Sequence, residues 1–170
     1  MFAYGSLMWR PGFAFQASSL ARLHGYHRRL CVYSWVHRGT QAKPGLVFGL
    51  DRGGACKGYA FQVAPEKEAE VIAYLDEREL VTDVYQRKRL PIVTEAGCVP
   101  AWCYVVRRDH DQYAGRLSED RLLALIQNSQ GVSGHCRDYV LSTVEHLEQM
   151  GVLDKTLKSV AKRLTTNHHA

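Results

Sequence analysis

The amino-acid sequence predicts a single α+β domain, a small, closed or nearly closed β-barrel flanked by helices. The first two-thirds of the chain has mostly strand-like segments, whereas the last third has the apolar spacing of helices. No linker or internal repeat divides the chain, and 170 residues are enough for one domain with a substantial core. We therefore expect one domain over residues 1–164 and a polar tail over residues 165–170, which includes His168 and His169.

The chain begins with a short apolar strand that runs into a glycine turn at Gly5. Glycine permits backbone angles that other residues avoid, and it lets another group approach the main chain closely. Consecutive N–H groups in such a turn can converge on an anion or a developing oxyanion, although an ordinary strand-ending turn has the same composition. The lead before Tyr4 is short for a first strand, so we expect that a few native residues are missing or that the start codon is misplaced.

Further strand signals follow this turn. Aromatic, β-branched and apolar residues gather in segments bounded by turn-forming residues, which is typical of strands. The predicted strands cover residues 26–33, 46–50, 56–63, 84–93 and 98–106. We expect residues 51–54 to form a turn that joins the second and third segments as a hairpin. Pro91 and Pro100 indicate a sheet edge or a bulge, because proline cannot donate a ladder hydrogen bond.

A helix is predicted over residues 65–79. Pro65 suits a first helical position, and Ala69, Ile72 and Leu75 recur at helical spacing with Val71 beside them. The same spacing puts Glu79 on the core-facing side at the helix C-terminus, with Asp76 at the edge of the stripe and Glu77 pointing away. Burial and the negative helix end both raise a carboxyl pKa, so Glu79 could exchange protons near neutral pH. Alternatively, Glu79 is solvated, or it pairs with Arg78 or a distant arginine.

Three helices are predicted in the last third of the chain. Ser118 caps the first, residues 137–150 form the second up to Gly151, and Asp154 caps the third. The first and the third have apolar residues on one face. We expect these faces to be Leu122, Leu123, Leu125 and Ile126 in the first helix, and Leu157, Val160, Ala161 and Leu164 in the third.

Composition excludes several classes of function. The five cysteines have no paired or metal-finger spacing, and the histidines form no metal-binding motif, so we expect free and mostly buried thiols and no metal.

No apolar run approaches the roughly 18 residues of a membrane span, and no signal peptide is evident, which favours a cytoplasmic protein. The net charge of +5 fits solvated strand faces, a positive cleft for a small polyanionic substrate, or nucleic-acid binding.

The ordered motifs of the chain resemble the ChaC-type γ-glutamylcyclotransferases, which act on glutathione. The resemblance spans nearly the whole chain, and the ordered set is far more specific than any one motif. It rests on Tyr4-Gly5-Ser6-Leu7-Met8-Trp9, Arg38-Gly39-Thr40 with Pro44-Gly45, Leu50-Asp51-Arg52-Gly53-Gly54, Tyr74-Leu75-Asp76-Glu77-Arg78-Glu79, Tyr113-Ala114-Gly115, and Ser133-Gly134 with Arg137-Asp138-Tyr139. Gln41-Ala42 follows Arg38-Gly39-Thr40 where the family often has Pro-Glu, so this loop can differ in shape.

The resemblance implies a small β-barrel with peripheral helices and a cofactor-free reaction on a small γ-glutamyl peptide. It implies that Tyr4-Gly5-Ser6-Leu7 holds the γ-glutamyl group and that Glu79 is the general acid/base. Tyr85 and Tyr113 look like the pocket tyrosines of the family. Arg38 either faces a substrate carboxylate or has a surface or structural role. The alternatives are a cyclotransferase for other γ-glutamyl amines or amino acids and, in another class, a basic nucleic-acid-binding module.

Overall fold

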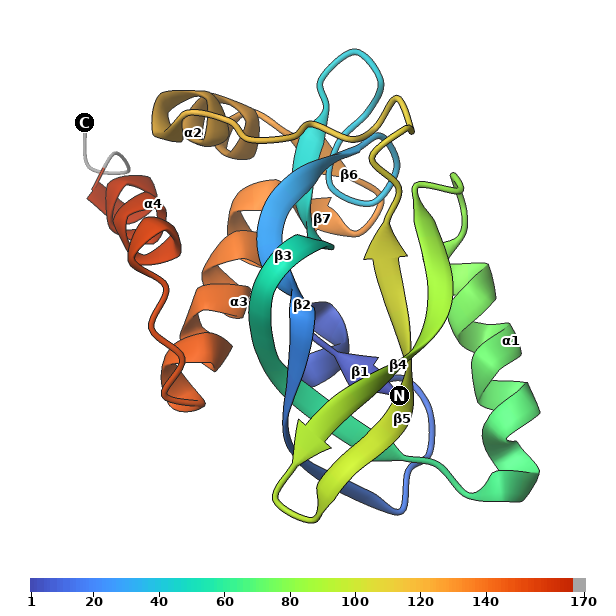
Figure 1. Cartoon of the computed structure of the whole chain (residues 1–170). Coiled ribbons are helices and arrows are strands. Elements are labelled where there is room, and N and C mark those ends of the chain that lie inside the picture. Colours follow the sequence, from blue (N-terminus) through green and yellow to red (C-terminus); the bar gives the residue numbers. More distant parts are fainter. Residues whose placement is uncertain (167–170) are drawn as a thin grey trace. The chain divides into compact units, whose positions relative to one another are not determined.

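The structure, a computed structural model, describes residues 1–166 and has the expected α+β fold. Strands dominate the first two-thirds of the chain and helices the last third (Figure 1). The helices are the short 3₁₀ turns η1 (Ser6–Met8) and η2 (Pro65–Lys67), and α1 (Glu68–Glu79), α2 (Glu119–Gln127), α3 (Cys136–Gln149) and α4 (Lys155–Thr166). Within these residues, no helix is both long enough and apolar enough to cross a membrane.

Five antiparallel strands form the main sheet. They are β1 (Phe2–Ala3), β2 (Ala17–Ser34), β3 (Gly45–Gln62), β4 (Tyr85–Thr94) and β5 (Gly97–Val106), hydrogen-bonded in the order β1-β3-β2-β4-β5. A second sheet of two short strands, β6 (Gln130–Gly131) and β7 (Gly134–His135), precedes α3.

The sequence predicted a closed or nearly closed barrel, and the main sheet is not closed within the described residues. β1 and β5 are the two edges of the sheet and are not neighbours in its hydrogen-bonded order, although they contact each other. The reason is the length of β1, which pairs with β3 only through Phe2↔Ala60 and Ala3↔Tyr59. Gly5 and the turn η1 follow at once, so too little strand remains to form a second ladder and close the sheet.

The predicted turn at residues 51–54 is also wrong, and with it the hairpin of residues 46–50 and 56–63. Both segments belong to the single strand β3. Gly53 and Gly54 have positive φ angles of 99° and 69° but remain within the strand. Glycine in this conformation lets a strand bulge and twist without reversing. The buried Asp51 carboxylate pairs with Arg29 at 2.8 Å and Arg108 at 2.6 Å, which fixes this part of β3.

Two compact units can be recognised in the chain, and β2 and β3 run through both. The first unit contains Met1–Arg29 and Gly49–Asp111, and the second contains Leu30–Phe48 and the chain from Gln112 onward. Each has a buried apolar core. Leu23, Leu50, Leu75, Ile92 and Val105 are buried in the first unit, and Leu46, Ile126, Val140, Val160 and Leu164 in the second. A single domain over residues 1–164 stays a prediction.

In the first unit, α1 lies along the β4–β5 hairpin (Figure 1). Strands β4 and β5 pair along their whole length, from Tyr85↔Val106 to Thr94↔Gly97. Pro91 lies just beyond the short stretch where β2 pairs with β4, and Pro100 lies on the edge strand β5. Both prolines therefore occupy positions where an N–H donor is not needed, as their sequence positions indicated.

In the second unit, α2, α3 and α4 pack against one another (Figure 1). The predicted caps are confirmed: Ser118 accepts a hydrogen bond from the Arg121 backbone at 3.3 Å, and Asp154 accepts one from Leu157 at 3.0 Å. Gly151, with φ of 66°, follows α3 as expected. α4 continues to Thr166, and His168 and His169 lie outside the described residues.

Candidate active site

Glu79 is the last residue of α1, on the face of the helix that packs inward. Val71 and Leu75 are buried, and Glu79 follows Leu75 by one helical turn, so all three share a face. Ala69, expected on this stripe, is exposed, because the inward face follows Val71 and Leu75. The Glu79 side chain is 21% exposed. Glu77 is exposed and points away as predicted, which makes Glu79 the inward-facing carboxylate at this helix end.

Two opposing effects set the acidity of Glu79. Burial raises the pKa of its carboxyl group, because the charged form loses hydration. The Arg78 guanidinium, with Nε 3.3 Å from Glu79 Oε1, lowers the pKa but does not cancel the effect of burial. The carboxyl group of Glu79 therefore keeps its proton up to a higher pH than an exposed glutamate does.

The glycine turn forms a single 3₁₀ turn after β1. Met8 N–H donates to the Gly5 carbonyl at 2.9 Å, and Arg10 N–H donates to the Ser6 carbonyl at 2.9 Å. Tyr4 and Leu7 are buried, and the Tyr4 carbonyl accepts a hydrogen bond from Arg28. The expectation that Gly5 adopts an angle that favours glycine is not met, because its φ is −131°. The turn bends at Ser6–Met8 instead. Backbone conformation therefore gives no reason for glycine at position 5, and the remaining reason would be the close approach of another group to its main chain.

Arg78 connects this turn to Glu79. Besides its ion pair with Glu79, its Nη2 donates to Ser6 Oγ at 2.9 Å, and its Nη1 donates to the Arg10 carbonyl at 3.1 Å and to Tyr74 Oη at 3.3 Å. The structure therefore brings together Ser6 and Glu79, two predicted site residues that are more than 70 positions apart in the sequence. Sequence reasoning treated Arg78 only as a possible partner of Glu79. Its position inside the same motif was the available signal for a larger role.

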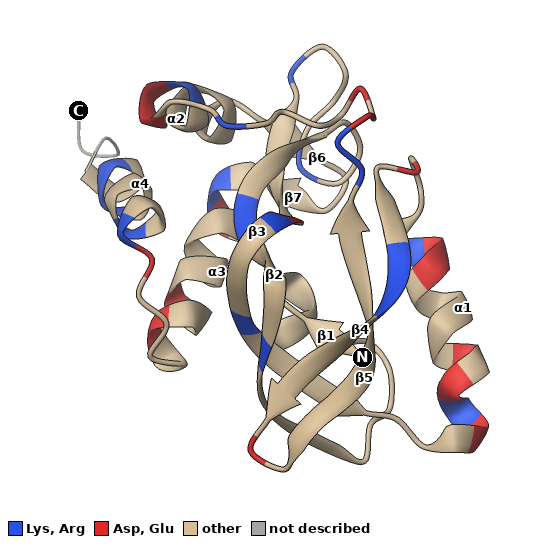
Figure 2. Ribbon diagram, in the orientation of Figure 1, with Lys and Arg blue, Asp and Glu red and all other residues tan. Residues whose placement is uncertain are grey.

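Three contacts with the sheet hold α1 in place. Tyr104 Oη donates to Asp76 Oδ1 at 2.7 Å, Arg87 forms an ion pair with the same carboxylate, and Trp102 Nε1 donates to Glu68 Oε1 at 2.8 Å. Figure 2 shows the acidic and basic positions along α1 and the basic position on β4 beside the helix. These contacts occur at both ends of α1, so they fix the direction of the helix that carries Glu79.

The remaining predicted site residues are Tyr85, Arg38 and Tyr113, which come from three different segments of the chain. Tyr85 begins β4, is buried and pairs with Val106. Arg38 and Tyr113 belong to the second unit. The Arg38 guanidinium donates to the Ser133 carbonyl and lies 5.1 Å from the centre of the Tyr139 ring. Tyr113 is half-buried and forms an isolated bridge with Val32. Roles for these three residues in substrate binding stay predictions.

Comparison with known proteins identifies the family. The sequence model of the ChaC-like protein family matches residues 1–167 of this chain. The chain belongs to the ChaC-like family. Glutathione-specific gamma-glutamylcyclotransferase 1 of mouse is 32% identical, across 98% of this chain and 78% of the relative. Glutathione-specific gamma-glutamylcyclotransferase of Escherichia coli is 30% identical, across 98% of this chain and 74% of the relative.

The fold of this ChaC-like chain agrees with a solved structure. A yeast gamma-glutamyl cyclotransferase specific to glutathione aligns with a TM-score of 0.89, across 99% of this chain and 97% of that one, at 22% sequence identity. A second crystal structure of the yeast protein gives a TM-score of 0.85. These likenesses show that the arrangement of strands and helices is that of the γ-glutamylcyclotransferases.

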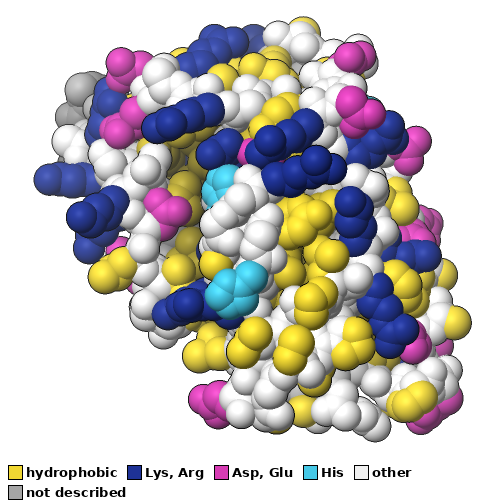
Figure 3. Space-filling model, in the orientation of Figure 1, with side chains coloured by type: hydrophobic (Ala, Val, Ile, Leu, Met, Phe, Trp, Pro, Cys, Tyr) yellow, Lys and Arg dark blue, Asp and Glu magenta, His cyan; other side chains and the backbone are white. Residues whose placement is uncertain are grey.

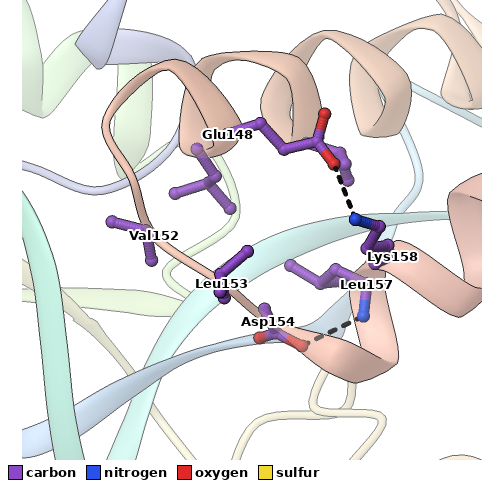
Figure 4. Close-up of a pocket in the computed structure, with 8 residues that line it drawn as sticks. Glu148, Val152, Leu153, Asp154, Leu157 and Lys158 are labelled. Carbon is purple, nitrogen blue, oxygen red and sulfur yellow. Dashed lines mark hydrogen bonds and ion pairs between the residues drawn. The ribbon is translucent and has the colours of Figure 1, made fainter.

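A shallow pocket occurs in the second unit of this ChaC-like chain, between the end of α3 and the start of α4. It is partly open to solvent and encloses little space, and apolar side chains make most of its wall (Figure 4). The Glu148–Lys158 ion pair, at 3.9 Å, and the Asp154 cap of α4 lie at its rim. None of the predicted site residues lines this pocket.

The cysteines of the described residues are free, and four of the five are buried. Cys98 is the exposed one, and Cys103, five residues along β5, is buried on the opposite side as predicted. Burial raises the pKa of the Cys103 thiol to about 12 and also raises the pKa of the Cys56 and Cys136 thiols. These three thiols therefore stay protonated and unreactive near neutral pH. Over residues 1–166, no group of three or more His, Cys, Asp or Glu side chains is arranged to hold a metal ion.

Proposed function

We propose that the protein is a glutathione-specific γ-glutamylcyclotransferase that converts glutathione to 5-oxoproline and cysteinylglycine in the cytoplasm. One observation carries this proposal most directly. A largely buried glutamate with a raised pKa, Glu79, is joined through Arg78 to the glycine turn that holds Ser6. Membership of the ChaC-like family and relatives with this activity from mouse and Escherichia coli support it.

The proposed reaction is an intramolecular aminolysis. The α-amine of the γ-glutamyl group attacks the γ-carbonyl carbon, a five-membered lactam closes, and the bond from that carbon to the cysteine nitrogen breaks. The substrate amine arrives as an ammonium and ends as the N–H of the lactam, so it loses one proton before the attack and a second as the ring forms. The departing amide nitrogen gains one proton to leave as an amine and a second to become an ammonium. The Glu79 carboxylate can take the first proton and deliver it to the leaving group. The proton balance closes without an oxidant, a metal or a cofactor.

The enzyme's main task is then to hold the folded conformer of the substrate. Preorganising an intramolecular attack lowers the barrier by several kcal/mol, at most about 7–11. We propose that the turn Tyr4-Gly5-Ser6-Leu7 holds the γ-glutamyl group, with its N–H groups directed at the α-carboxylate or at the oxyanion of the tetrahedral intermediate. Tyr85, Tyr113 and Arg38 are proposed to contact the substrate, Arg38 through a carboxylate.

A substrate panel tests the function. Purified protein is incubated separately with glutathione, γ-glutamyl-alanine and γ-glutamyl-lysine, and 5-oxoproline is measured. We expect release from glutathione and much less from the other two. Turnover of only the latter compounds would move the protein to the cyclotransferases for other γ-glutamyl compounds. No turnover, together with RNA binding that falls steeply with salt, would favour a nucleic-acid-binding module.

A further inference from the structure

All three nitrogens of the Arg78 guanidinium are engaged. Nε faces Glu79, Nη2 donates to Ser6 Oγ, and Nη1 donates to the Arg10 carbonyl and Tyr74 Oη. The side chain is 27% exposed, so these contacts are partly shielded from water. A guanidinium has five N–H donors in a fixed planar fork, and four groups in different directions occupy it here. Arg78 is therefore held in one orientation.

The chain beyond η1 lies directly against the same helix. Gly12 has φ of 75°, and a Cβ atom there would lie 2.1 Å from Tyr74 Oη. Tyr74 and Arg78 are one turn apart on α1, so they present adjacent side chains to this segment. Residues 6–12, called here the front segment, are thus hydrogen-bonded to Arg78 at Ser6 and at Arg10, and they pack closely against Tyr74 at Gly12.

We propose that Arg78 is a positioning residue that holds the front segment and the Glu79 carboxylate in one fixed arrangement. This proposal rests on the proposed function, in which residues 4–7 hold the γ-glutamyl group and Glu79 moves the proton. The substrate amine must then meet Glu79 while its γ-glutamyl group sits on the turn. Arg78 sets the spacing of these two groups because it touches both. Arg78 needs no contact with the substrate for this role.

The geometry requires arginine and not merely a positive charge. A lysine ammonium would keep the charge beside Glu79, but it is a single point and cannot reach Glu79, Ser6 and Arg10 in three directions at once. Arg78→Lys therefore separates positioning from charge. Arg78→Met removes both and keeps an apolar stem of similar length. Lys67→Met is the matched control, because Lys67 forms an exposed ion pair with Glu70 at the far end of this helical segment.

The experiment combines two measurements on the full-length chain and its variants. The first is amide hydrogen exchange of residues 6–12, which needs no substrate. The second is the pH profile of kcat and KM with glutathione. In Arg78→Lys we expect faster exchange in the front segment and a loss of about 10- to 100-fold in kcat/KM, because small misplacement of reacting groups is costly. The midpoint of its pH profile should stay near that of the wild type.

In Arg78→Met we expect the same faster exchange and a pH midpoint moved to higher pH, since the cation that lowers the pKa of Glu79 is gone. Ser6→Ala should show part of the exchange effect, and its effect should not add to that of Arg78→Lys, because both changes break the same contact. Lys67→Met should match the wild type in both measurements.

The positioning role would be overturned if amide hydrogen exchange of the front segment were as slow in Arg78→Lys as in the wild type. It would also be overturned if exchange were faster but kcat and KM stayed at their wild-type values. A loss of activity in Arg78→Lys with unchanged exchange would also overturn it, because it would put Arg78 in contact with the substrate. If the wild type turns over no γ-glutamyl compound, the proposed function fails. Amide hydrogen exchange then still shows whether Arg78 holds the front segment in place. An unchanged exchange rate in Arg78→Lys would overturn the proposal even without an assay of activity.

Discussion

At the scale of single residues, the position of one carboxylate matters most. Glu79 faces inward at a helix end, whereas Glu77, two residues earlier, is exposed. The two residues have the same side chain and lie in the same motif, so they form a natural pair for experiments. Their difference comes from helix geometry alone, because two residues correspond to a rotation of about 200° around the axis.

We predict that Glu79→Gln loses about 10²- to 10⁴-fold in kcat with glutathione, because glutamine keeps the shape of glutamate but cannot carry a proton. Steady-state kinetics with 5-oxoproline detection measure the loss. Glu77→Gln is the control and should keep wild-type activity. Near-normal turnover by Glu79→Gln, or equal losses in both variants, would remove Glu79 from the mechanism.

The raised pKa of Glu79 also predicts how stability depends on pH. A carboxyl group whose pKa rises on folding binds its proton more tightly in the folded chain than in the unfolded chain. The folded state therefore loses stability as pH rises from the ordinary carboxyl pKa through the raised value. The melting temperature of Glu79→Gln should rise relative to the wild type as pH increases from 5 to 8. A difference that stays constant, as expected for Glu77→Gln, would contradict the raised pKa.

At the scale of elements, α1 acts through its attachment to the β4–β5 hairpin. The Asp76 carboxylate accepts a hydrogen bond from the Tyr104 hydroxyl and forms an ion pair with Arg87. The Glu68 carboxylate accepts a hydrogen bond from the indole N–H of Trp102. These contacts explain how a 12-residue helix with only two buried side chains keeps a defined position. They also link the orientation of Glu79 to residues that have no role in the chemistry.

We predict that Tyr104→Phe lowers the free energy of unfolding by about 1.5–3 kcal/mol, the range for a hydrogen bond to a charged group. It should also reduce kcat, because α1 carries Glu79. Asp154→Ala, which removes the cap of α4, should cost about 1 kcal/mol and leave kcat unchanged. Urea unfolding and kinetics on both variants test this contrast. Equal kcat values for the two would show that the attachment of α1 does not affect Glu79.

At the scale of the whole molecule, basic residues are spread over many elements, whereas exposed apolar side chains form a group on the β4–β5 hairpin. Lys and Arg positions occur on several strands, loops and helices of the described chain, and not along one helix (Figure 2). Hydrophobic side chains gather over the β4–β5 hairpin (Figure 3), where Val93 and Val99 are 45% and 39% exposed. Cys98 lies on this same hairpin, directly opposite Val93. The exposed thiol is therefore on the hairpin and not on the turn or helix end that carry Ser6 and Glu79.

We predict that iodoacetamide modifies one thiol per folded chain, Cys98, and that this leaves the rate with glutathione unchanged. The other four thiols should react only after unfolding, because they are buried. Mass spectrometry counts the modified sites, and assays after removal of excess reagent measure the rate. Dialysis against EDTA should have no effect on a reaction that needs no metal. Inactivation by iodoacetamide that substrate prevents would instead put a cysteine at the site.

The sequence by itself determined the α+β class, the helix that ends at Glu79, the caps Ser118 and Asp154, and the family. Each of these is a local property: helical spacing, capping side chains and ordered motifs are written in consecutive residues. The inward direction of Glu79 also followed from spacing, because the helix around it is regular. The burial of most cysteines followed from composition.

Only the tertiary structure decided how distant segments meet. Closure of the sheet depended on the length of β1, and the continuity of β3 through Gly53 and Gly54 depended on the neighbouring strand and on the burial of Asp51. The bond from Arg78 to Ser6 joins residues 72 positions apart. No periodicity encodes such a contact, because it arises from the packing of η1 against α1. The sequence shows which residues carry charge and polarity, and the packing selects which of them become partners.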